Sequence, residues 1–188
     1  MLNEFLSIII KSIRLDKSLY SNNKNFGEAS IYFAVSIILI GSIISIIPNS
    51  SFLNYMSLNF NLGQVKGPSL KAVIISSFLM WVFKSIYLYF FGVVLFPNKK
   101  TKCNFRKILI LVAFAQSPLL LNFIVFNQNL LFFIIVTYVW YNVSLIIGLN
   151  IILNYENYIK TTLISLAPQI IFILYILSLF QGNSNMLS

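Results

Sequence analysis

Lys84 is the strongest candidate for a functional residue, because it is a charged side chain in the middle of a long apolar run. A lysine at the centre of a membrane helix costs at least about 2.5–3.5 kcal/mol unless it is paired or reaches water. Gln116, Asn122 and Asn142 lie well inside other apolar runs. If those helices are neighbours, the four side chains form an intramembrane polar site for an anionic solute or lipid. The alternative is a structural lysine that snorkels or is hydrogen-bonded within the bundle.

Side chains for other chemistry are scarce. The chain has no histidine and one cysteine, and its four acids are Glu4, Asp16, Glu28 and Glu156. Disulfides, metal clusters and paired acid–base groups need residues that this chain lacks. Ser85 does not pair with Lys84, because adjacent helical residues point in different directions. We therefore predict a protein that is not an enzyme and has no catalytic residues, cofactor or metal centre.

The elements that hold such a site are predicted to be transmembrane helices. Of 188 residues, 59% are hydrophobic and 9% are charged, and the mean hydropathy is +0.87, which is far too apolar for a water-soluble domain. A helix needs roughly 20 apolar residues to cross a hydrocarbon layer of about 30 Å. We expect an all-α bundle over residues 29–180, followed by a tail at 181–188. Its five spans lie at about 29–47, 72–96, 108–126, 130–153 and 161–180.

Two prolines interrupt these predicted spans. Pro118 lies in the third span and Pro168 in the fifth. Each removes one backbone hydrogen bond and can kink its helix, and broken helices line the pathways of some transporters. The alternative is a packing role, because proline is common in membrane helices.

Residues 1–28 precede the first predicted span. The apolar residues Leu2, Phe5, Leu6, Ile9 and Ile13 share one helical face. This pattern predicts an amphipathic helix that lies in the cytoplasmic membrane interface. A cytoplasmic helix packed on the bundle explains the pattern equally well.

The distribution of lysine and arginine predicts the orientation. Of the thirteen basic residues, ten lie on the side of the N-terminus, Lys66 and Lys71 lie on the other side, and Lys84 lies within a span. Cytoplasmic loops are enriched in these residues, so the N-terminus is expected inside and the C-terminus outside. The net charge of +9 thus indicates a membrane and not nucleic acid. The densest group would also lie against anionic lipid headgroups: Lys99, Lys100, Lys102, Arg106 and Lys107.

The order of these features resembles the Yip1-domain family of five-span membrane proteins. Phe26-Gly27-Glu28-Ala29 resembles the entry into the family's first span. Phe105-Arg106-Lys107, followed by Ala115-Gln116-Ser117-Pro118, resembles its third helix, where an Ala-x-x-Pro pattern recurs. Tyr138-Val139-Trp140, Gly148-Leu149 and a short loop ending at Lys160 resemble its fourth helix and the turn into the fifth.

The resemblance implies a non-enzymatic scaffold that recruits partners in membrane organisation or trafficking. Many bacterial members carry Ser-Pro where Leu15-Asp16 stands here. Eukaryotic members are associated with Rab-family GTPases through a longer N-terminal region, so the short segment here argues against a GTPase partner and for the prokaryotic form. The expected partners are membrane lipids, anionic ones included, and membrane proteins or further copies of this chain. The expected location is a bacterial inner membrane or otherwise an endomembrane. A small transporter or channel built around Lys84 is the alternative function.

Overall fold

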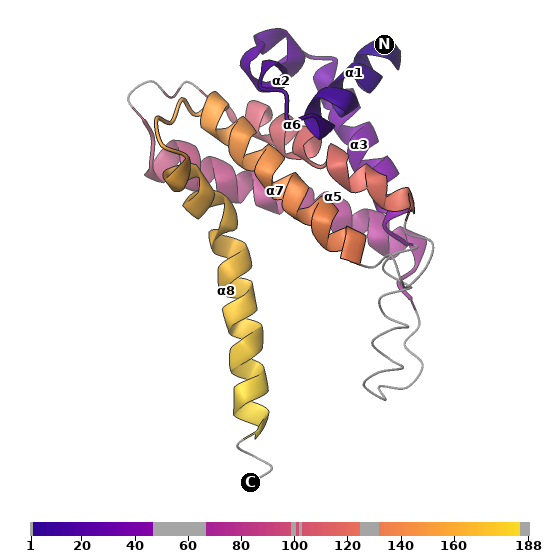
Figure 1. Cartoon of the computed structure of the whole chain (residues 1–188), viewed down its shortest axis with the longest axis vertical. Coiled ribbons are helices and arrows are strands. Elements are labelled where there is room, and N and C mark those ends of the chain that lie inside the picture. The colour runs from indigo at the N-terminus through magenta and orange to yellow at the C-terminus, as the bar shows by residue number, and fades with distance from the viewer. Residues whose placement is uncertain (1, 47–66, 99–100, 102, 125–131, 185–188) are drawn as a thin grey trace.

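The computed structural model describes residues 2–46, 67–98, 101, 103–124 and 132–184, with side chains in the last helix described as far as residue 171. Every regular element in these ranges is helical, as predicted. The main helices, shown in Figure 1, are α1 (Leu2–Ile13), α2 (Ser18–Ser21), α3 (Ser30–Ile44), α5 (Leu70–Tyr89), α6 (Phe105–Ala115), α7 (Phe132–Ile152) and α8 (Tyr158–Ser184). The tighter or wider helical segments are η1 (Asn23–Phe26, 3-10), η2 (Phe90–Leu95, π) and η3 (Ser117–Ile124, 3-10).

Three stretches are long and apolar enough to cross a membrane. They are Leu70–Leu95, Phe105–Ile124 and Phe132–Ile152, which correspond to the second, third and fourth predicted spans. The chain is therefore an all-helical protein with three candidate membrane spans in its described part.

The other two predicted spans are described only in part. α3 is apolar but has 15 residues, which at 1.5 Å per residue reach about 22 Å and fall short of a hydrocarbon layer of about 30 Å. The predicted end of this span, at residue 47, lies outside the described residues. α8 is long enough, with 27 residues, but its side chains beyond residue 171 are not described.

α6 lies at the centre of the bundle. Ile108 and residues 110–115 are all buried, and α6 contacts α1, α3, α5 and α7. A helix that is apolar all round must be covered on every side. The buried indole of Trp81 in α5 donates to the Leu109 carbonyl over 2.8 Å, which satisfies its one polar atom.

The N-terminal layer, formed by α1, α2 and η1, is part of this core. α1 packs on α6, α7 and η3, and Ile8 and Ser12 are its buried residues. The Ser12 hydroxyl donates to the Phe114 carbonyl over 2.6 Å, and the hydroxyls of Tyr20 and Ser144 lie 2.6 Å apart. These contacts show α1 packed on the bundle, which is one of the two arrangements that the sequence left open. Leu2 and Leu6, on the predicted apolar face, stay exposed.

Tyr155 ties the turn between α7 and α8 to the end of α5. Its buried hydroxyl lies 2.6 Å from the Gly92 carbonyl and 2.7 Å from the Phe96 carbonyl. The Thr101 hydroxyl donates to the Leu153 carbonyl over 2.6 Å beside it. These contacts hold the end of η2 and Thr101 against the turn between α7 and α8.

This contact predicts alkaline sensitivity. Burial raises the pKa of Tyr155 from 10.0 to about 12. Because the folded pKa lies above the unfolded one, the neutral phenol stabilises the fold below about pH 10, and that contribution is lost as the pH rises toward 12. Tyr155→Phe should lower the free energy of unfolding at pH 8 by about 1 kcal/mol and flatten its decline above pH 10, as measured by denaturant titrations in detergent. An equally steep decline in both proteins would exclude Tyr155 as a cause.

Candidate functional site

A pocket of about 660 Å³ surrounds Lys84 between α5, α7 and α8. Lys84 is the only charged residue that lines it in the part of the chain described. We call it the Lys84 pocket, and its lining residues are Met80, Phe83, Lys84, Tyr87, Tyr138, Ser165, Pro168 and Gln169. Its size is in the range of small-molecule sites, and its mixture of apolar walls with a few polar groups is typical of them.

An aromatic ring is the partner of Lys84. The ammonium nitrogen lies 4.4 Å from the centroid of the Tyr141 ring, a cation–π contact. The side chain of Gln116 lies beside the Tyr141 hydroxyl. Gln116 therefore belongs to the surroundings of Lys84 through a residue that the sequence analysis did not single out. A buried tyrosine next to Asn142 in an apolar run is too common to have identified it.

Asn142 is connected to the pocket through Gln169. Its side-chain oxygen accepts a hydrogen bond of 2.9 Å from the Gln169 amide, and its amide donates to the Tyr138 carbonyl over 2.8 Å. Gln169 and Tyr138 both line the pocket. The polar side chain of Asn142 thus supports the pocket wall.

Asn122 lies in a different contact. Its side-chain oxygen accepts a hydrogen bond of 2.7 Å from the Thr137 hydroxyl, which joins η3 to α7. Asn122 is not among the residues that line the Lys84 pocket. Of the three amides predicted around Lys84, the structure therefore connects Gln116 and Asn142 with the pocket, each through another residue.

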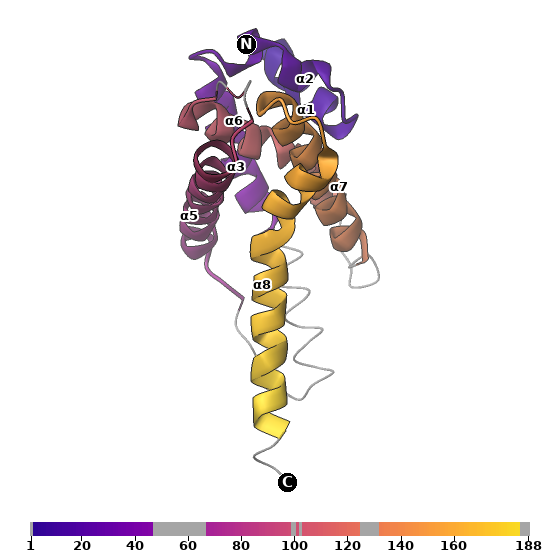
Figure 2. The same cartoon turned by 90° about the vertical axis from the view of Figure 1, so that its left-hand side faces the viewer.

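The two prolines differ in their surroundings. Pro118 is buried. It is the second residue of η3, where the third span has changed from α-helical to 3-10 geometry. Pro168 lies inside α8 and lines the pocket, where it cannot donate to the Ile164 carbonyl. The first turns of α8 lie along the bundle and the rest extends away from it (Figures 1 and 2).

Ser165 brings a polar group without a partner into the pocket wall. Its hydroxyl is buried and has no hydrogen-bond partner among the described residues. A helical serine commonly bonds a carbonyl in the preceding turn, as Ser85 does with Trp81 over 2.7 Å. A buried polar atom without a partner is costly, so the Ser165 hydroxyl is an unsatisfied polar group in the pocket wall.

Two of the five basic residues predicted to contact lipid headgroups lie against the N-terminal layer or against Gly27, which directly follows it. Arg106 donates to the Gly27 carbonyl and the Lys107 ammonium donates to the Asn23 side chain, both over 3.2 Å. Lys99, Lys100 and Lys102 lie outside the described residues. The two described members of the cluster thus lie beside the N-terminal layer.

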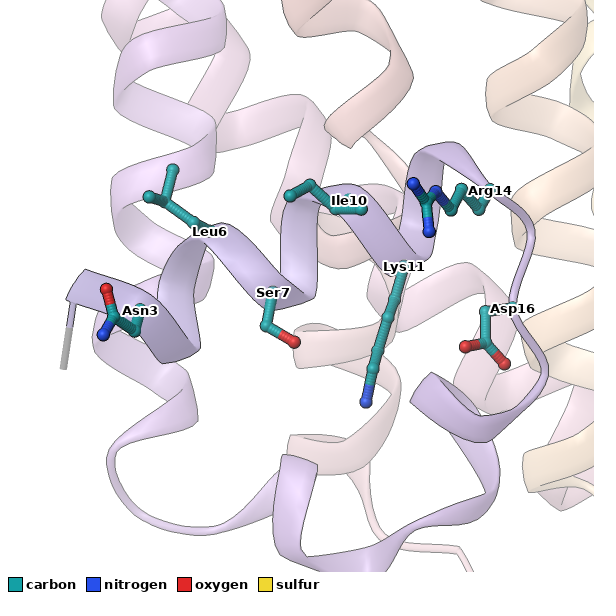
Figure 3. A pocket seen from close by; sticks show the side chains of 7 residues that line it. All are labelled: Asn3, Leu6, Ser7, Ile10, Lys11, Arg14 and Asp16. Carbon is teal, nitrogen blue, oxygen red and sulfur yellow. The ribbon is translucent and has the colours of Figure 1, made fainter.

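A shallow groove of about 390 Å³ runs along the exposed side of α1 (Figure 3). Leu6 and Ile10 line it together with the cations Lys11 and Arg14. Asp16 closes one end, and hydrogen bonds from Ser18 keep the pKa of its carboxyl below the usual value. The groove combines apolar and basic side chains on one surface.

No protein-family model, curated protein or solved structure matches this chain. The class of protein therefore rests on the geometry alone. Three apolar stretches long enough to cross a membrane indicate an all-helical membrane protein, and a pocket with one lysine lies among its described helices.

Proposed function

We propose that this protein is a non-enzymatic, five-span membrane protein that binds an anionic solute or lipid at Lys84 and carries it within the membrane. The observation behind the proposal is the Lys84 pocket, whose only charged lining residue within the described ranges is a cation. A charge in the hydrocarbon layer is costly, and the ring of Tyr141 offsets part of that cost. An anion in the pocket would offset more of it through a charge-assisted hydrogen bond.

The proposed topology adds α3 and α8 to the three long spans. In this topology the N-terminus, the loop after η2 and the turn before α8 face the cytoplasm, because the basic residues gather there. Arg106 contacts Gly27 and Lys107 contacts Asn23. These contacts support the topology, because they place the basic residues at the start of α6 and the basic N-terminal segment at the same end of the bundle.

The test is the retention of anions by purified protein. Wild type, Lys84→Met and the control Lys71→Met, which changes an exposed lysine on the same helix, are purified in parallel in a mild detergent. Bound anionic solutes and lipids are then quantified by mass spectrometry. At least one species should be retained by wild type and Lys71→Met and should fall about tenfold in Lys84→Met, the loss expected from removing a charged hydrogen bond. Equal retention in all three would refute the proposal.

The second candidate is a membrane scaffold, which the Yip1-like resemblance implies. The observation that favours it is the exposed apolar edge of α1, where Leu2, Leu6 and Ile10 are 70%, 46% and 48% exposed beside Lys11 and Arg14. An apolar edge flanked by cations suits an anionic membrane surface. In a Cys103→Ser background, an environment-sensitive fluorophore on Leu6→Cys should shift to the blue when phosphatidylglycerol is added to phosphatidylcholine proteoliposomes. The same label on exposed Asn22→Cys should not shift.

A further inference from the structure

The mouth of the Lys84 pocket faces outward from the bundle. Met80, Phe83, Lys84 and Tyr87 follow the i, i+3, i+4, i+7 pattern of one helical face, so they lie on one side of α5. Met80 is 68% exposed and Phe83 is 64% exposed, although both belong to a stretch apolar enough to span a membrane. Exposed apolar side chains in a membrane span contact acyl chains, so the rim of the pocket borders lipid.

Besides the two lining tyrosines, the pocket has three polar side chains that are less exposed than this apolar rim, and they come from α5 and α8. α5 provides the Lys84 ammonium, and α8 provides the Ser165 hydroxyl and the Gln169 amide. The Gln169 amide is held by Asn142, whereas Ser165 has no partner in the described part of the chain. A cation and an unsatisfied hydroxyl in one pocket are suited to an acidic group that accepts hydrogen bonds.

We propose that the occupant is an anionic phospholipid of the surrounding bilayer, which enters sideways between α5 and α8. This inference rests on the function proposed above and names its ligand. The acidic phosphate pairs with Lys84 and accepts a hydrogen bond from Ser165, while the acyl chain lies over Met80 and Phe83. The apolar rim favours a lipid over a soluble anion. Either anion loses water on reaching Lys84, but only a lipid has an acyl chain, already in the hydrocarbon layer, that can cover Met80 and Phe83.

The dimensions of the pocket agree with a lipid. Its 660 Å³ is many times the roughly 30 Å³ that one water occupies in the liquid, so a small inorganic ion would leave most of it empty. Lys84 lies roughly 17 Å along the helix from Leu95, at about 1.5 Å per residue. Half of the hydrocarbon layer is about 15 Å, so the bound headgroup is drawn deep into the membrane.

The experiment is photo-crosslinking in the membrane with the full chain. The protein is reconstituted into phosphatidylcholine vesicles that contain a photoactivatable phosphatidylglycerol, and adducts are mapped by mass spectrometry. Peptides with Met80 and Phe83 should be labelled in wild type. Labelling should fall about tenfold in Lys84→Met and about threefold in Ser165→Ala, which lose a charged and a neutral hydrogen bond. Lys84→Arg and the control Lys71→Met should retain it.

Two further arms separate this inference from the function on which it rests. A photoactivatable phosphatidylcholine should label the pocket weakly and without dependence on Lys84, and excess inorganic phosphate should not displace phosphatidylglycerol. If phosphate displaces the lipid only when Lys84 is present, the pocket takes a soluble anion, so the lipid inference fails and the proposed function stands. If neither phosphate nor phosphatidylglycerol depends on Lys84, both fail.

Discussion

Gly148→Ala is expected to destabilise the bundle by about 1–3 kcal/mol, the usual cost of overpacking a core. A Cβ at this position would clash with a methyl carbon of Leu111 and lie 3.0 Å from the ring of Tyr20. Leu111 is completely buried, and Tyr20 is held by Ser144. Neither neighbour can therefore move without disturbing the contact between α6, α7 and the N-terminal layer.

Gly41→Ala is the matched control. Its Cβ would meet only a methyl carbon of Leu120 at 3.7 Å, an ordinary contact, and alanine favours a helix over glycine by about 1 kcal/mol. We expect Gly41→Ala to be as stable as wild type or slightly more stable, and Gly148→Val to be less stable than Gly148→Ala. Thermal unfolding of the purified proteins in detergent measures this order. Equal stability of the two alanine variants would mean that α6 and α7 pack less closely than described here.

Deleting residues 2–13 is expected to destabilise the bundle by about 3 kcal/mol or more. The estimate combines the burial of Ile8, worth about 1.5–3 kcal/mol, with the Ser12 hydrogen bond to Phe114, worth about 1 kcal/mol. The deletion also removes Phe5, whose ring centroid lies 5.8 Å from that of Phe33 in α3. The loss should appear as a lower denaturant midpoint of the purified chain.

A double change on the exposed edge of α1 separates this structural role from a role at the membrane surface. Leu6→Ser with Ile10→Ser alters two exposed residues, and surface changes of this kind usually shift stability within about 0.5 kcal/mol. If the deletion has no more effect than this double change, α1 is a separable tail, as a domain boundary at residue 28 would imply. If only the deletion lowers the stability, α1 is part of the core. If a binding partner of the protein is then lost from both variants, that partner contacts the exposed edge of α1.

The sequence by itself determined the class of protein and the position of the unusual charge. Apolar run length locates helices that can cross a membrane, because each such helix satisfies its own backbone polar groups. The second, third and fourth predicted spans accordingly lie within two or three residues of Leu70–Leu95, Phe105–Ile124 and Phe132–Ile152. A lysine inside such a run stands out for the same reason, since its cost depends on its depth in the hydrocarbon layer.

Only the tertiary structure decided which side chains meet. Lys84 lies over the ring of Tyr141, Asn142 accepts from Gln169, and Asn122 accepts from Thr137. Each contact depends on how two helices are rotated and offset against each other, and in an apolar run almost every face is equally hydrophobic, so periodicity does not report that rotation. The burial of Ser12 against Phe114 was equally out of reach, because the two residues are distant in the chain and are brought together by packing alone.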